Sequence, residues 1–152
     1  MTPVKTMIVS AIENGTVIDH LKAGQGLKIV ELLGLARHKK GVSVGLNLAS
    51  ELLGLKDLVK VEDRELIPEE ANQIALLSPR ATVSIIKDFA VIEKYRVEIP
   101  ETISRIFTCA NPRCITNHEE IASHFHIVRK FPRPKILCHY CNKTYEAFDD
   151  YH

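Results

Sequence analysis

The four cysteines of this chain all lie in its last third, as two closely spaced pairs. Cys109 and Cys114 form a C-x4-C motif, and Cys138 and Cys141 form a C-x2-C motif. Two short-spaced corners of this kind supply four thiolates to a tetrahedral Zn²⁺ with little strain. The spacing therefore predicts a structural zinc site in a small module that depends on its metal to fold.

Other uses of the cysteines fit the sequence less well. A disulfide framework requires an oxidising compartment, and we find no secretory signal pattern at the N-terminus, so we expect reduced cysteines and a cytoplasmic protein. Redox chemistry at a C-x-x-C motif leaves the first pair unexplained. A catalytic zinc keeps a position for water, whereas four cysteines complete the shell. The nearby histidines that could replace a cysteine are His118, His124, His126 and His139.

The balance of charges bears on possible partners. The chain has 20 Lys and Arg against 19 Asp and Glu, a formal net charge of +1. A ribbon that binds nucleic acid usually shows a clear basic excess, so nucleic acid is not an expected partner. A zinc-ribbon nucleic-acid-binding protein nevertheless stays the alternative function. No apolar run approaches the length of a membrane-spanning helix, so no membrane association is expected.

Apolar periodicity over the first hundred residues predicts an α+β fold. The order β-α-β-β-α-β is the ferredoxin-like arrangement, an antiparallel sheet with two helices on one face, and an additional terminal strand is expected. Pro68 suits the first turn of the second helix. The expected elements are a strand over 6–12, a helix between 24 and 34, strands over 42–48 and 56–61, a helix from 68, and strands over 81–86 and 89–97.

A domain boundary is expected at Ile99, Pro100 and Glu101, which divides the chain into residues 1–100 and 101–152. Short strands are expected beyond it, over 106–108, 123–130 and 135–137, with turn residues between them. The second domain is therefore expected to be a small all-β domain of the zinc-ribbon or rubredoxin-like type.

The P-loop, HExxH and GxGxxG motifs are all missing, and the serines and histidines form no recognisable nucleophile constellation. Asp19 and His20 follow an apolar run, and their ordinary interpretation is a solvated loop. The functional interpretation is a ligand site in which His20, Lys60 and Lys94 meet phosphate. The residues alone thus favour a two-domain binding or regulatory protein.

Four motifs of the first hundred residues accompany the two cysteine pairs. They are 15–20 (GTVIDH), 45–48 (GLNL), 56–62 (KDLVKVE) and 78–83 (SPRATV). Together they resemble the regulatory chain of aspartate carbamoyltransferase, from about residue 6 to residue 148. The resemblance implies a non-catalytic chain with a nucleotide-binding domain and a zinc domain. It also implies catalytic trimers as partners, bridged by regulatory-chain homodimers, with CTP and UTP as inhibitors and ATP as activator.

Carried onto this sequence, the family's nucleotide site assigns Asp19 to the ribose, His20 and Lys94 to the phosphates, and Lys60 to the ribose and base. The resemblance further implies that the base edge is read by Val9, Ser10, Ala11 and Ile12. The apolar walls of the implied site are Leu58, Ile86 and Val91.

Two positions of the implied site depart from the family pattern. Ser84 stands where asparagine is frequent, and Phe89 stands where tyrosine is frequent. Both changes remove polar groups, so the resemblance leaves the preference between CTP and ATP open.

Overall fold

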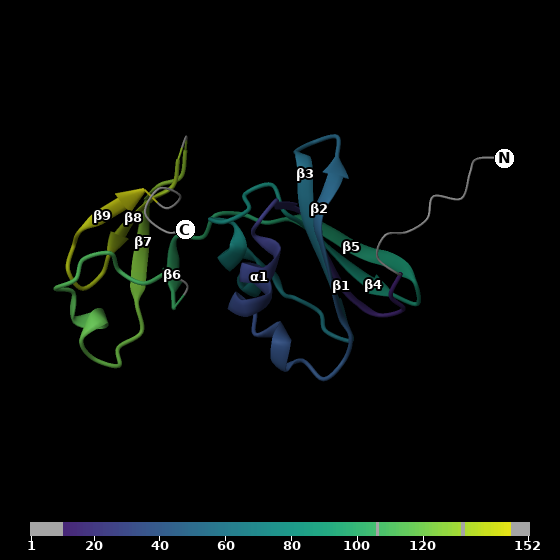
Figure 1. The fold of residues 1–152 in the computed structure, drawn as a ribbon, viewed down its shortest axis with the longest axis horizontal. Helices are drawn as coiled ribbons and strands as arrows, with labels where there is room; N and C mark the ends of the chain where they lie inside the picture. The colour runs from purple at the N-terminus through teal and green to yellow at the C-terminus, as the bar shows by residue number, and fades with distance from the viewer. Residues whose placement is uncertain (1–10, 106, 132, 147–152) are drawn as a thin grey trace.

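The structure, a computed structural model, describes residues 11–105, 107–131 and 133–146. It contains two antiparallel sheets, one on each side of residues 97–101 (Figure 1). The elements of the first part are β1 (Gly15–Lys22), α1 (Gly26–Leu32), η1 (Leu35–Arg37), β2 (Val42–Ser50), β3 (Gly54–Glu62), α2 (Pro68–Ala71), η2 (Asn72–Ile74), β4 (Thr82–Lys87) and β5 (Ala90–Arg96).

The first sheet has the strand order β2-β3-β1-β4-β5, and every neighbouring pair is antiparallel. Its first four strands have the ferredoxin-like order, and β5 is the additional terminal strand. The predicted α+β class is therefore confirmed. The second helix begins at Pro68 as expected, although it is a single turn that continues as η2.

The predicted first strand falls largely outside the described part of the chain: residues 6–10 are not described, and Ala11 and Ile12 belong to no strand. The first strand among the described residues is β1, where no strand was predicted. A β-bulge shifts the register of β1 against β3 between Ile18 and Leu21, and His20 there has a φ of 56°. The bulge breaks the period-two alternation by which a strand is recognised, so β1 does not read as one.

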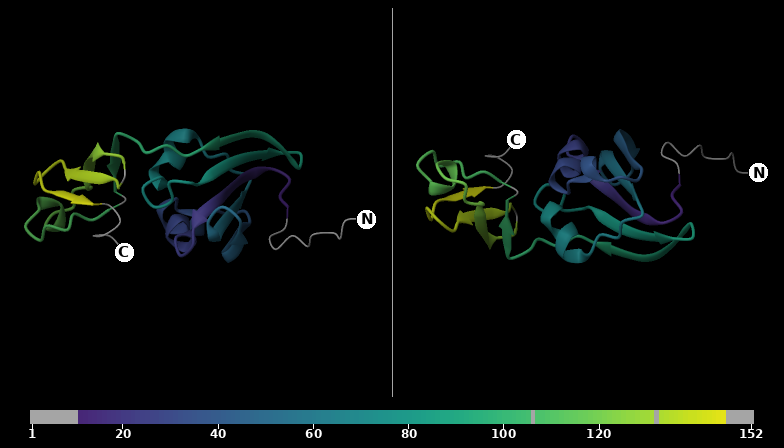
Figure 2. Two further views of the ribbon diagram at one scale, coloured as in Figure 1. Left: turned by 90° about the horizontal axis from the view of Figure 1, so that it is seen from above. Right: turned by 90° about the horizontal axis from the view of Figure 1, so that it is seen from below.

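The two faces of the first sheet differ. The helices α1 and α2 lie on the side toward the second sheet (Figures 1 and 2), and they cover buried side chains such as Ile18, Val59 and Val83. Side chains alternate along each strand, so Val17 and Lys60 point away from the helices. We call this opposite side the distal face.

A buried carboxylate connects three segments on the helix side. Asp57 is fully buried, and its Oδ2 accepts hydrogen bonds from the backbone N–H groups of Gly24 (3.0 Å) and Gly26 (2.8 Å). Its Oδ1 accepts another from the backbone N–H of Asn47 (2.9 Å), at the bulge in β2. Because each of these bonds involves a charged acceptor, Asp57 fixes the start of α1 against β3.

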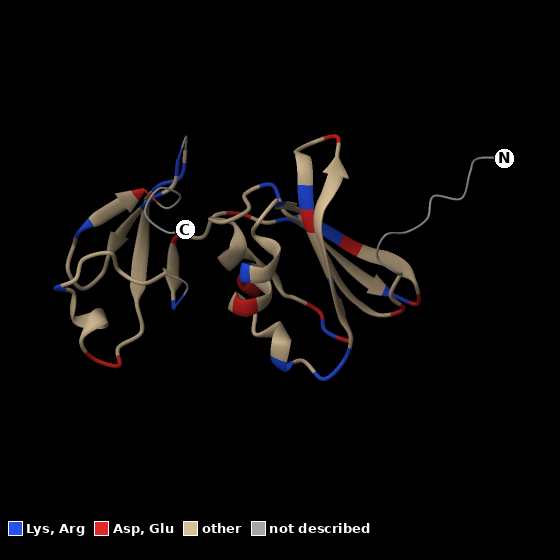
Figure 3. Ribbon diagram, in the orientation of Figure 1, with Lys and Arg blue, Asp and Glu red and all other residues tan. Residues whose placement is uncertain are grey.

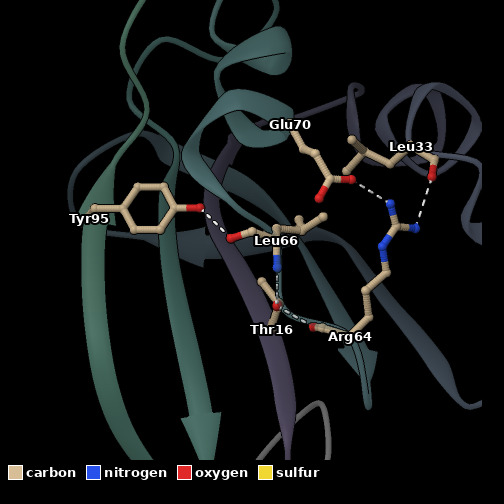
Figure 4. A network of polar contacts seen from close by, with 6 residues as sticks. All are labelled: Thr16, Leu33, Arg64, Leu66, Glu70 and Tyr95. Carbon is tan, nitrogen blue, oxygen red and sulfur yellow. Dashed lines mark hydrogen bonds and ion pairs between the residues drawn. The ribbon is translucent and has the colours of Figure 1, made fainter.

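The connection from β3 to α2 is held by a polar network (Figure 4). The hydroxyl of Thr16 accepts a hydrogen bond from the backbone N–H of Leu66 (3.1 Å). The guanidinium of Arg64 donates to the carbonyl of Leu33 (3.1 Å) and to Glu70 (2.8 Å). The network therefore ties the helix layer to the central strand.

The last member of this network is Tyr95, whose hydroxyl donates to the carbonyl of Leu66 at 2.8 Å (Figure 4). Burial, together with the charges of Glu93, Glu70 and Glu69, raises the pKa of Tyr95 from 10.0 to about 12. The folded state thus keeps a phenol proton that the unfolded state releases at lower pH.

Replacing Tyr95 with phenylalanine should change how stability depends on pH. Stability that comes from a raised pKa is fully present below pH 10.0 and is lost as the pH rises through about 12. We expect Tyr95→Phe to lower the free energy of unfolding by about 1 kcal/mol at pH 7, and to remove part of the alkaline loss. Urea unfolding at several pH values measures both. Parallel pH profiles for the variant and the parent chain would contradict the assignment.

The second sheet has the strand order β6-β7-β8-β9. The second and third strands predicted here, over 123–130 and 135–137, match β7 and β8. The predicted strand over 106–108 is wrong: residues 107 and 108 are not in a strand, and residue 106 lies outside the described part. The first strand lies nearer the boundary, and β9 was not foreseen because it is so short. The elements are β6 (Thr102–Ser104), η3 (Ile115–Asn117), β7 (His124–Arg129), β8 (Lys135–Cys138) and β9 (Thr144–Glu146).

The two parts meet at the helix layer. The ammonium of Lys28, on α1, lies 5.9 Å from the centre of the Phe107 ring. A cleft of about 290 Å³ lies between the helices and β6, and it is bordered by Leu32, Arg64 and Ser104 among others. The helices therefore stand between the distal face and the second sheet (Figure 2).

Candidate functional sites

The four cysteines converge in the second part of the chain. Their sulfur atoms all lie within 4.8 Å of one another. The Sγ atoms of Cys109 and Cys141 are 3.7 Å apart, as are those of Cys114 and Cys138. A metal with four thiolates at about 2.3 Å has S···S edges of about 3.8 Å, whereas a disulfide bond is about 2.05 Å long. The arrangement therefore fits a tetrahedral metal ion and excludes disulfides.

Hydrogen bonds within the two loops hold the sulfur atoms in place. In the second loop, the backbone carbonyl of Cys138 accepts a hydrogen bond from the backbone N–H of Asn142 (3.0 Å). The backbone N–H of Cys138 donates to the carbonyl of Lys143 (2.9 Å). In the first loop, the side-chain amide of Asn117 donates to the carbonyls of Cys109 (2.9 Å) and Asn111 (2.7 Å). Both corners are thus closed by the protein itself.

The surroundings of the sulfur atoms favour thiolates at some positions and thiols at others. Burial raises the pKa of Cys138 to about 12. Burial also acts on Cys141, but hydrogen bonds from the backbone of Lys143 and the side chain of Asn111 outweigh it and lower the pKa to about 7. Metal ligation requires thiolates, so Cys141, with the lower pKa, binds a metal more readily than Cys138 does.

On the distal face of the first sheet, three candidate residues of the nucleotide site form one row with Val17. In the register of the strands, Val17 of β1 lies opposite Lys60 of β3 and opposite Ser84 of β4. Ser84 in turn lies opposite Lys94 of β5. Residues directly opposite each other in an antiparallel pair share a face, so a lysine stands at each end of this row.

Asp19 and His20 lie beside this row, in the bulge of β1. The interpretation of this pair as a solvated loop is wrong, because both residues belong to a strand and are half-buried. The carboxylate of Asp19 lies 2.9 Å from the ammonium of Lys56 and accepts the backbone N–H of His20 at 2.6 Å. The imidazole Nδ1 of His20 is 3.0 Å from the hydroxyl of Thr82.

Charge and burial act together at Asp19 and Lys60. Burial raises the pKa of Asp19, but the ion pair with Lys56 and the N–H of His20 lower it overall. Lys60 is only 6% exposed, and burial lowers its pKa, an effect that Asp19 partly offsets. The centre of the distal face is thus a partly desolvated cluster of two lysines, a carboxylate and an imidazole.

The apolar candidates differ in their exposure. Leu58 is half-buried on β3, and Ile86 is 9% exposed on β4 opposite Val91, which is 58% exposed. Phe89 occupies the turn between β4 and β5 and is 68% exposed. Its backbone N–H donates to the carbonyl of Glu13 at 2.9 Å, next to Ile12. The structure thus brings this turn against the chain that enters β1.

The residues predicted to contact the edge of the base, 9–12, are only partly within the described residues. Val9 and Ser10 lie outside the described residues. Ala11 is exposed, and Ile12 is buried, 7% exposed.

Sequence reasoning missed Lys56 and Thr82 as neighbours of Asp19 and His20. Lys56, Leu58 and Lys60 alternate at period two, which is a signal that Lys56 shares their face. A cavity of about 640 Å³ also adjoins His20 and extends over Leu53, Leu55, Ser78 and Arg80. This cavity could not be predicted from the sequence, because its walls come from three separate segments.

Comparison with known families matches almost the whole chain. Residues 7–98 match the allosteric domain of the aspartate carbamoyltransferase regulatory chain, and residues 101–149 match the metal binding domain of that chain. The protein belongs to this family. The predicted resemblance is confirmed, and the family is that of a regulatory chain with an allosteric and a metal-binding domain.

Individual relatives agree with the family match. The regulatory chain of aspartate carbamoyltransferase from Pyrococcus horikoshii is 51% identical over 140 residues, which cover 91% of both chains. That from Tolumonas auensis is 45% identical over 145 residues, which cover 95% of this chain and 94% of the relative.

Two further observations bear on other classes of protein. Lys and Arg are interspersed with Asp and Glu along the described ribbon of both parts (Figure 3), whereas a domain that binds nucleic acid usually shows a clear basic excess. Among residues 11–105, 107–131 and 133–146, no helix is long and apolar enough to cross a membrane.

Replacing one cysteine should abolish metal binding. We expect Cys114→Ser to lose the bound metal and to make residues 101–146 sensitive to protease, because a small module of this kind depends on its metal. Metal content by mass spectrometry and limited proteolysis measure the two effects. The control is Arg113→Ala, which removes an exposed neighbouring side chain and should keep the metal content of the parent chain. Full metal retention in Cys114→Ser would contradict the four-cysteine site.

Proposed function

We propose that this chain is the non-catalytic regulatory subunit of an aspartate carbamoyltransferase. It binds CTP, UTP and ATP as allosteric effectors and passes their effect to catalytic trimers. Residues 1–100 form the effector domain, and residues 101–152 form the domain that contacts the catalytic chain. One observation supports the proposal: this chain belongs to the family and has both a distal face with clustered cations and a four-cysteine metal site.

The metal is proposed to be Zn²⁺, one per chain, with a structural role. Four thiolates suit Zn²⁺, and a completed shell leaves no position for a reacting water molecule. The S···S distances of 3.7 Å support this choice. Since such thiols must stay reduced, we also propose that the protein works in the cytoplasm.

The nucleotide is proposed to lie across the distal face of the first sheet. A triphosphate requires cations, and His20 and Lys94 would supply them. Asp19 and Lys60 would contact the ribose and the base. The half-buried position of Asp19 and the buried position of Lys60 support this assignment, because hydrogen bonds to charged groups are stronger away from water. Leu58, Ile86 and Val91 would form the apolar walls.

The base would be recognised chiefly by backbone groups of residues 9–12. Fixed backbone donors and acceptors distinguish cytosine, uracil and adenine by the pattern along their edges. Val9, Ser10, Ala11 and Ile12 are the proposed residues, and the bond from Phe89 to Glu13 supports a fixed position for the end of this segment. Ser84 and Phe89 would tune the preference between the nucleotides.

Coupling requires that a nucleotide binds two quaternary states with different affinity, typically by about 1–3 kcal/mol. A regulatory-chain homodimer is proposed to bridge the catalytic trimers. The position of β2 at an edge of the sheet supports such a pairing, since an edge strand offers unpaired backbone groups to a second chain. The helix layer would carry the signal from the distal face to the metal domain.

Nucleotide titration tests the effector site. We expect CTP or ATP to bind the metal-loaded chain at one saturable site in a calorimetric titration. Lys94→Ala should weaken the binding about tenfold or more, since a hydrogen bond to a charged group contributes about 1.5–3 kcal/mol. Lys87→Ala is the matched control, because it removes an exposed lysine from the neighbouring strand on the opposite side. If neither nucleotide binds while fold and metal are intact, the chain is a structural bridge without an effector role.

Metal removal tests the contact with the catalytic chain. A thiolate-selective reagent should release free catalytic trimers from the assembled complex, because the unfolded metal domain can no longer form the interface. Analytical ultracentrifugation with measurement of the released Zn²⁺ follows both species. Complexes that stay assembled after complete metal loss would rule out a metal-dependent interface.

A further inference from the structure

Three histidines gather on the second sheet, apart from the four cysteines. One ring nitrogen from each of His124, His126 and His139 lies within 4.8 Å of the others. The ring centres are 5.2 Å apart for His124 and His126, 5.3 Å for His124 and His139, and 5.2 Å for His126 and His139. The three imidazoles thus form a nearly equilateral group.

The strand register brings these side chains to one face. His124 and His126 are two residues apart on β7, so their side chains point the same way. Phe125 lies opposite Cys138, and the next residue, His139, donates its backbone N–H to the carbonyl of His124 at 2.9 Å. Phe125 and Cys138 are fully buried on the other side of the sheet. The imidazole face is therefore distinct from the sulfur face of the same two strands.

We propose that His124, His126 and His139 form a second metal site, which binds a divalent transition metal such as Zn²⁺, Co²⁺ or Ni²⁺. Imidazole nitrogen is a preferred ligand of these ions, whereas Mg²⁺ and Ca²⁺ take oxygen ligands. Three protein ligands leave a position for solvent, unlike the complete shell of four cysteines.

The distances between the nitrogens are compatible with ligation. Nε2 of His126 and Nδ1 of His139 are 3.0 Å apart. Two nitrogens bound tetrahedrally to one metal at about 2.0–2.1 Å lie about 3.4 Å apart. A small rotation of either ring therefore increases the distance between the two nitrogens from that of a hydrogen bond to that of two ligands of one metal.

A neighbouring hydroxyl orients the third ring. The hydroxyl of Ser104, on β6, lies 2.6 Å from Nδ1 of His124, which leaves Nε2 as the nitrogen that this ring offers. Tyr140 packs edge-on against His139, with ring centres 5.1 Å apart. Ser104 is thus a positioning residue, as a second partner of a metal-ligating histidine commonly is.

The site is tested on the full chain with its four-cysteine site already filled. Co²⁺ is titrated in a calorimeter and followed by optical absorption. We expect one further Co²⁺ per chain, with absorption bands of nitrogen ligation and no thiolate-to-cobalt charge transfer, which separates this site from exchange at the cysteines. His126→Gln should weaken binding by more than tenfold, and Ser104→Ala by about tenfold.

His118→Gln is the matched control, because it removes an exposed histidine of the same domain that lies outside the cluster. It should leave the second equivalent unchanged. The metal content of the four-cysteine site reports that each variant is folded. A stoichiometry of one metal per chain, or a second equivalent that His126→Gln does not weaken, would overturn the proposal. Neither the metal stoichiometry nor the effect of His126→Gln depends on nucleotide binding. The effector proposal is therefore tested separately.

Discussion

The double pairing of β1 determines what each face of the first sheet can do. β1 lies at the centre of the sheet and is antiparallel to both β3 and β4. Thr16 and Ile18 are thereby fixed toward the helices, while Val17 and Asp19 are fixed toward the distal face. A slip by one residue would exchange the two sets and expose the core, so the buried side chains enforce the position of the charged ones.

The proposed effector site therefore depends on the packing of buried side chains on the opposite side of the sheet. The bulge at His20 adds a local adjustment, since a bulge turns the side chains beside it. The polar groups of the cluster have partners within the protein: Asp19 forms an ion pair with Lys56, and His20 a hydrogen bond with Thr82. A nucleotide that contacts Asp19 must compete with Lys56, so its net affinity is smaller than the sum of its contacts.

Much of this could be foreseen from particular residues. The cysteine pairs identified the metal module because ligand spacing is a local property of the sequence. The alternation over 42–48 and 56–61 located the hairpin of β2 and β3. The strand β1 was not foreseen because a bulge interrupts its alternation. The strands β6 and β9 are three residues long, too short for periodicity. The pairing of Asp19 with Lys56 joins residues far apart in sequence, and only the strand register brings them together.

The two faces of the β7–β8 pair also impose an order of events. The imidazoles are held together by the strands whose other side carries Cys138. We expect those strands to need a sulfur-bound ion to fold. In a chain whose cysteines are empty, the arrangement that could hold an ion at the histidines is populated only in the small folded fraction, and its apparent affinity falls by that fraction. Occupancy of the histidines would thus report that the cysteines are already filled, which makes loading sequential even though the two sites share no ligand.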